Sequence, residues 1–150
     1  GGGGVDWGIL GLDWLLVIGY WGAGGGYMGR GFKELEVYQL AEELADEVWR
    51  IVAGWDFFAK DTVGKQLVRA ADSIGANLAE GNGRGSFRDN RRFINIARGS
   101  LTETQHWLRR AHCRDLLTTE QTAKLQPLIT KLAPKLNAYR NAITKMISKN

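Results

Sequence analysis

The sequence predicts an all-α protein: an up-down-up-down four-helix bundle over residues 32–150, preceded by a Gly/Trp-rich extension, residues 1–31. Apolar residues recur at steps of three and four in four successive segments, the spacing of helices that bury one stripe. Short capping or glycine-rich sequences separate these segments, so consecutive helices are expected to pack antiparallel. A chain of 150 residues is also long enough to bury one core.

The first two helices follow from this spacing. In the first, the apolar stripe consists of Val37, Ala41, Leu44, Val48, Ile51 and Trp55. The second covers about residues 61–80, with Val63, Leu67, Ala70, Ile74 and Leu78 inward. It runs into the glycine-rich residues 81–85, where a glycine in the left-handed conformation is expected to close the helix.

The third and fourth helices carry capping signals. Ser86 and Asp89 form an N-cap pair for the third, and Thr118 and Gln121 form a capping box for the fourth. The inward residues of the third are Phe93, Ala97, Leu101, Thr104, Leu108 and Ala111. Those of the fourth are Leu125, Leu128, Leu132, Leu136, Tyr139, Ile143 and Met146. Pro127 and Pro134 each remove a hydrogen bond, so we expect a kink or a fourth helix that begins near Gln126.

Charge is distributed unevenly along the bundle. Residues 33–56 contain seven acidic and two basic residues, whereas residues 84–114 contain eight arginines and two acidic residues. These arginines are Arg84, Arg88, Arg91, Arg92, Arg98, Arg109, Arg110 and Arg114. Such an excess is typical of a face that binds phosphates or carboxylates. An alternative to which we give the same weight is that the arginine-rich face pairs with the acidic first helix, within one chain or between subunits.

A row of polar residues follows one face of the second helix: Arg69, Ser73, Asn77 and Glu80. Ser100 and Glu103 share a face of the third helix. Glu80 and Glu103 could form a catalytic carboxylate pair. We favour an interhelical hydrogen-bond network in which Arg69 neutralises a carboxylate, because no nucleophile accompanies the pair. We therefore expect no catalytic residues and no enzyme.

Other chemical signals are weak. His106, His112 and Cys113 do not share a helix face, so we expect neither a metal site nor a cofactor. Residues 81–86 lack the Gly-Lys-Ser/Thr ending of a phosphate-binding loop and are interpreted as a linker. A single cysteine excludes an intrachain disulfide and favours the cytoplasm.

In the extension, Trp7, Trp14, Trp21 and Met28 recur every seven residues. We interpret residues 5–28 as an assembly or docking element, in which glycines allow close approach and tryptophans fill the gaps. A membrane segment is the second interpretation, although the uncharged residues 14–29 are shorter than the roughly 20 residues a bilayer needs. A flexible tail is the third.

Three segments resemble a known family: residues 32–37 (FKELEV), 66–81 (QLVRAADSIGANLAEG, ending at Gly81) and 97–103 (ARGSLTE). They are similar to the bacterial four helix bundle proteins, also called S23 or 23S rRNA intervening-sequence proteins. The resemblance covers essentially residues 32–150. It implies a homopentameric, barrel-like assembly without established biochemical activity. It also implies kinship with the accessory protein of diversity-generating retroelements, which binds a reverse transcriptase and nucleic acid through a basic surface.

Together these observations predict a non-enzymatic homo-oligomer, a pentamer by resemblance. Its partner would be RNA, DNA or a nucleic-acid enzyme such as a reverse transcriptase, bound by the arginines of the third helix. The alternative is a structural subunit that docks into a larger or membrane-associated assembly through residues 5–28. The predicted location is cytoplasmic, with membrane association as the corresponding alternative.

Overall fold

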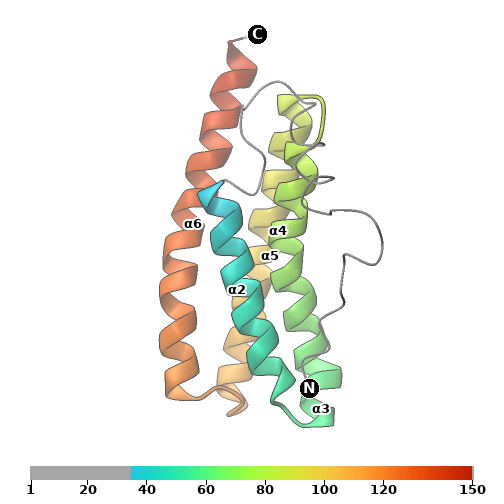
Figure 1. Cartoon of the computed structure of the whole chain (residues 1–150), viewed down its shortest axis with the longest axis vertical. Coiled ribbons are helices and arrows are strands. Elements are labelled where there is room, and N and C mark those ends of the chain that lie inside the picture. Colours follow the sequence, from blue (N-terminus) through green and yellow to red (C-terminus); the bar gives the residue numbers. More distant parts are fainter. Residues whose placement is uncertain (1–34, 150) are drawn as a thin grey trace, which may run out of the picture.

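The computed structural model describes residues 35–149, and their regular secondary structure is entirely helical. In chain order the elements are α2 (Glu36–Ala53), α3 (Phe57–Ala59), the π-helical turn η3 (Lys60–Gly64), α4 (Lys65–Asn82), α5 (Phe87–Cys113) and α6 (Thr119–Ser148). α3, η3 and α4 follow one another without a break, so the chain forms four rods that run alternately down and up (Figure 1). The predicted fold class, an up-down-up-down four-helix bundle, is confirmed.

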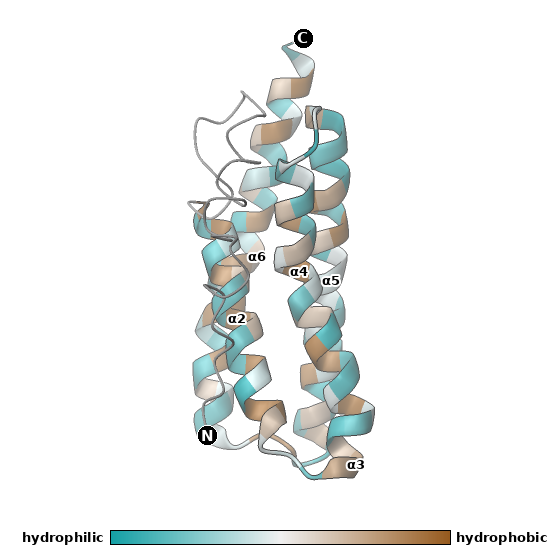
Figure 2. Cartoon of the chain, turned by 45° about the vertical axis from the view of Figure 1, so that its right-hand side comes forward, coloured by the Kyte–Doolittle hydropathy of each residue, from teal (hydrophilic) through white to brown (hydrophobic). Residues whose placement is uncertain are grey.

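The four rods pack as the corners of a square. α2 contacts α4 and α6, and α5 contacts the same two helices, so α2 and α5 lie at diagonal corners. Hydrophobic and hydrophilic residues alternate along every helix (Figure 2). The largest fully buried side chains come from all four rods and include Leu44, Leu67, Ile94 and Leu132. Burial of each such side chain stabilises the fold by about 1.5–3 kcal/mol.

The predicted apolar stripes form this core, with three exceptions. Phe93 is only half-buried, and the neighbouring Ile94 is fully buried instead. Met146 is 37% exposed, because α6 extends beyond the ends of the other helices near the C-terminus (Figure 1). Trp55 does not lie on the first helix, which ends at Ala53. It lies in the following connection, where its indole Nε1 donates a hydrogen bond of 3.0 Å to the carbonyl of Leu116.

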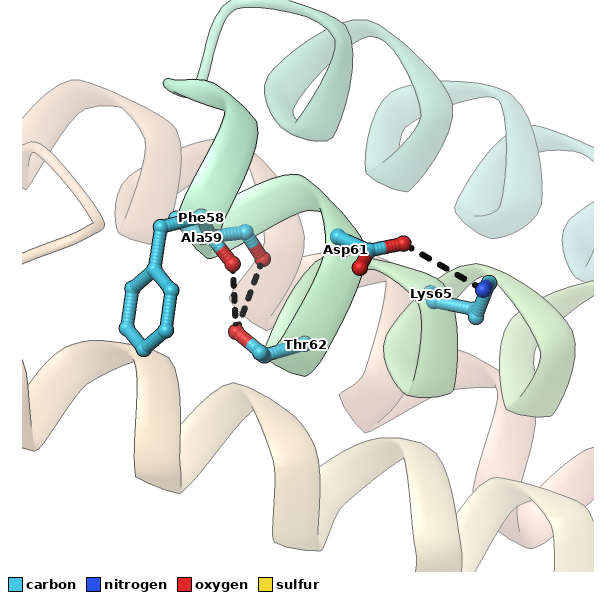
Figure 3. A network of polar contacts seen from close by, with 5 residues as sticks. All are labelled: Phe58, Ala59, Asp61, Thr62 and Lys65. Carbon is cyan, nitrogen blue, oxygen red and sulfur yellow. Dashed lines mark hydrogen bonds and ion pairs between the residues drawn. The ribbon is translucent and has the colours of Figure 1, made fainter.

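The second rod begins at Phe57, earlier than predicted, because Asp56 caps it. The Asp56 carboxylate accepts a hydrogen bond of 2.9 Å from the amide of Ala59. In the π-helical turn that follows, Thr62 Oγ1 donates to the carbonyl of Phe58 at 2.7 Å (Figure 3). A Cβ at Gly64 would lie 2.7 Å from Cγ1 of Val52, so only glycine allows this turn to approach α2 so closely.

The predicted left-handed glycine closure of the second helix is wrong. Gly81 lies inside α4, and the φ angle of Gly83 at its end is −81°, in the right-handed region. The left-handed closure occurs instead at the end of α5, at Asp115, with φ of 59°. There the amide of Leu116 donates to the carbonyl of Ala111 at 2.9 Å, as in a Schellman motif.

The predicted caps are confirmed. The amide of Asp89 donates to Ser86 Oγ at 3.1 Å, and Thr118 and Gln121 exchange bonds of 2.9 and 3.1 Å. A fourth helix beginning near Gln126 is wrong, because α6 is continuous from Thr119 to Ser148 with both prolines inside it. Pro127 and Pro134 lie on its exposed side, where water can bond the carbonyls that they leave unpaired.

Candidate nucleic-acid interface

Acidic and basic residues are segregated between the helices. α2 carries five carboxylates and one arginine, whereas α5 carries six arginines and two carboxylates. α6 is also basic, with five lysines or arginines and one glutamate. Because α2 and α5 are diagonal, the helix richest in arginine is kept apart from the acidic helix of its own chain.

The arginines of α5 occupy two edges of its exposed half. Arg91, Arg98 and Arg109 are spaced by seven and eleven residues, which places them on one edge. Arg98 lines a groove together with residues of α6, so this edge faces α6. Arg92 and Arg110 follow the opposite edge, and Arg88 lies between the two. Arg84 precedes the helix and Arg114 ends it.

Seven of these eight arginines have no carboxylate partner in the described part of the chain. The exception is Arg84, which pairs with Glu80 at 2.7 Å. Arg84 and Arg92 also place their guanidinium groups 4.9 and 5.9 Å from the ring centre of Phe93, a cation–π arrangement. The ion pair that joins two helices is Lys135–Glu36 at 2.9 Å, between α6 and α2. Within one chain, residues 35–149 therefore show no pairing of the α5 arginines with the acidic helix.

The predicted polar network is smaller than expected. Asn77 Nδ2 donates to Ser73 at 2.7 Å (carbonyl) and 2.9 Å (Oγ), and Ser100 Oγ lies 3.0 Å from Ser73 Oγ. This contact joins α4 to α5. Glu80 is held by Arg84 and lies outside this contact.

Two further residues of the predicted polar network, Glu103 and Arg69, also lie outside the hydrogen-bonded contact between α4 and α5. Glu103 accepts a bond of 3.3 Å from Trp107 Nε1 on its own helix. Arg69 is exposed and has no ion pair among the described residues. Neither Arg69 nor Glu103 belongs to the contact between α4 and α5.

The sequence analysis did not predict one buried polar pair, Asn90 and Tyr139. Asn90 Nδ2 donates to the Tyr139 hydroxyl at 3.1 Å, which joins α5 to α6. Burial raises the pKa of Tyr139, and the hydrogen bond from Asn90 opposes that shift. The signal was present: Asn90 lies four residues before Ile94, on the inward stripe of the third helix.

Some sequence features are not addressed by the structure. Trp7, Trp14, Trp21 and Met28 lie outside the described residues, so the assembly or membrane role of residues 5–28 stays a prediction. Within residues 35–149, no helix is long and apolar enough to cross a bilayer. In that same range there is no cluster of three or more His, Cys, Asp or Glu that could hold a metal ion.

Comparison with protein families gives a match over most of the described chain. The family model described as 23S rRNA-intervening sequence protein matches residues 33–138, which include α2, α4, α5 and most of α6. No curated protein matches the chain.

Proposed function

Because this chain belongs to the 23S rRNA-intervening sequence protein family, we propose that it is a non-enzymatic homo-oligomer that binds nucleic acid through the arginines of α5. The observation that carries the proposal is the set of arginines without carboxylate partners at the corner diagonal to the acidic helix. Solvated guanidinium groups are suited to bidentate contacts with phosphate. Binding of this kind releases counterions and is strongly salt-dependent.

Exposed large apolar side chains outside α5 support self-association. Trp49 on α2 is 62% exposed, and Phe57 and Phe58 on α3 are 81% and 77% exposed. Exposed apolar side chains of this size are typical of a protein interface. A second copy that covered Trp49 on α2, the helix diagonal to α5, would leave α5 facing outward. In a ring, which the family resemblance implies to be pentameric, the arginines would form a repeated positive belt.

The test reverses three charges at the start of α5. The variant Arg88→Glu, Arg91→Glu, Arg92→Glu is compared with wild type by fluorescence anisotropy, using a labelled single-stranded RNA at low salt. At about 1 kcal/mol per lost phosphate contact, the affinity is expected to fall by about 100-fold or more. Light scattering is expected to give the same mass for both proteins.

The matched control reverses three charges outside α5, along the groove between α2 and α4: Lys60→Glu, Lys65→Glu and Arg69→Glu. Because Trp49 lines the same groove, light scattering must give this variant the mass of wild type. It changes the net charge by the same amount and is expected to retain most of the affinity. An equal loss in both variants would show that only net charge matters. If neither wild type nor residues 32–150 bind RNA, and deletion of residues 1–31 disperses the particles, the docking alternative replaces the proposal.

A further inference from the structure

A polar groove lies between α5 and α6, on the edge of α5 that carries Arg98. Its volume is about 330 Å³, within the range of small-ligand sites. α5 contributes Asn95, Arg98, Gly99 and Gln105, and α6 contributes Asn137, with Leu136 among the apolar lining residues. The groove is therefore rich in amides and contains one cation, and none of its lining residues is acidic.

Apart from Thr102, whose hydroxyl donates a hydrogen bond of 3.2 Å to the carbonyl of Arg98, the polar side chains of this groove are not used by the fold. In the described part of the chain, neither the three amides nor the Arg98 guanidinium makes a side-chain hydrogen bond or ion pair. Each amide offers two donors and an acceptor, and the guanidinium offers five donors. A ligand that carries both a phosphate and an aromatic heterocycle with adjacent donors and acceptors matches this lining.

Gly99 provides an independent observation. A glycine inside a helix costs about 1 kcal/mol relative to alanine, and Gly99 lies in the middle of the 27-residue α5. At Gly64 and Gly81 close packing explains why the residue is glycine, because an added Cβ would lie 2.7 Å from a neighbouring atom. At Gly99 an added Cβ would meet nothing within 4 Å. Packing within the described chain does not require this glycine, which lines the groove.

We propose that this groove binds one unstacked base of a single-stranded RNA. Arg98 contacts the phosphate of that nucleotide, while Asn95 and Asn137 contact the base edge. Gln105 lies about 15 Å from Asn95 along α5 and lines the far end of the groove. Adenine fits this lining best, because Asn forms a bidentate pair with its adjacent donor and acceptor. Single-stranded RNA is the substrate class in which a base is free to leave the stack. The inference rests on the proposed function and adds base preference to phosphate binding.

The path of a bound strand is consistent with this site. Arg91 and Arg109 share the edge of Arg98, two and three helical turns away from it. A backbone that follows these arginines would therefore pass over the groove. The phosphate contacts would give affinity for any strand, and the groove would add discrimination.

The test compares oligo(A) and oligo(C) RNA of equal length by fluorescence anisotropy. Wild type is expected to prefer oligo(A) by about tenfold, in line with one bidentate base contact. Gly99→Leu adds a large side chain to the lining of the groove, and its Cβ meets no other atom, so the helix tolerates it. We expect this variant to bind both RNAs with similar affinity and unchanged salt dependence. Asn137→Ala, on the exposed side of α6, is expected to reduce the preference in the same direction.

The outcomes separate this inference from the proposed function. If wild type binds neither RNA, the proposed function is wrong. If wild type binds both RNAs equally, or if the preference persists in Gly99→Leu, the groove does not read bases while the α5 interface stands. Circular dichroism and the melting temperature establish that Gly99→Leu is folded, and Lys60→Glu serves as a surface control that leaves the preference intact.

Discussion

Replacing Gly81 with alanine would place a methyl group in the contact between α4 and α5. The added Cβ would lie 2.7 Å from Cβ of Phe93, 2.8 Å from Oδ1 of Asn90 and 3.2 Å from the Asn90 carbonyl oxygen. Neither a Cβ atom nor a carbonyl oxygen can rotate away, so the two helices must separate. Overpacking of this kind costs about 1–3 kcal/mol, and we expect the upper end here.

The helix preference of alanine offsets part of that cost, by at most about 1 kcal/mol. The net destabilisation is then about 2 kcal/mol, which corresponds to a melting temperature lower by about 4–8 °C for a chain of this length. Gly99→Ala is the matched control, because its Cβ meets nothing within 4 Å. That variant is expected to be more stable than wild type by up to about 1 kcal/mol.

Urea unfolding followed by circular dichroism measures both variants at one fixed protein concentration, since any oligomer would make stability depend on concentration. Unchanged m-values would show that the midpoint shifts report stability. If Gly81→Ala were as stable as wild type, or if Gly99→Ala were less stable, the packing described for these glycines would be wrong.

Three further predictions concern polar groups. Tyr139→Phe leaves the buried Asn90 amide without its hydroxyl partner and should cost about 1–3 kcal/mol in urea unfolding; an unchanged midpoint would contradict the buried bond. Burial, followed by repulsion from Asp46, raises the pKa of Asp72 above its usual value. Ionisation of Asp72 therefore lowers the stability of the fold, and this loss begins near pH about 4 and is complete above the raised pKa. Asp72→Asn should therefore raise the melting temperature at pH 7 but not at pH about 3. The gain in the free energy of unfolding should be no more than about 0.5 kcal/mol, and an equal gain at both pH values would refute this cause. Thr118→Ala removes half of the capping box and should cost about 1 kcal/mol, with faster amide exchange in the first turn of α6; unchanged exchange would contradict the cap.

Local sequence signals predicted most of the fold because they act over one or two helical turns. The steps of three and four located the buried stripes, and Ser86 and Thr118 marked two helix starts. These local signals gave wrong predictions where contacts between helices determine the structure. Pro127 is tolerated because it lies on the exposed side of α6, and Gly81 serves close packing rather than a left-handed turn.

The candidate interface was predictable in composition but not in arrangement. The count of arginines in residues 84–114 identified a basic helix. Its diagonal position relative to α2, which leaves those arginines without carboxylate partners in the described chain, depends on how the four rods assemble. The groove at Arg98 was also missed, because residues from two helices form it.

The dependence of RNA affinity on salt tests the central claim most directly. Binding is measured between about 50 and 200 mM salt, and the logarithm of the association constant is plotted against that of the salt concentration. For single strands each phosphate contact contributes a slope of about −0.7, so seven arginines set a limit near −5 per protomer, and removal of three should make the slope shallower by about 2. A steep slope that becomes shallower in the Arg88→Glu, Arg91→Glu, Arg92→Glu variant is the predicted result. A slope near zero, or one that the variant leaves unchanged, would contradict nucleic-acid binding by α5.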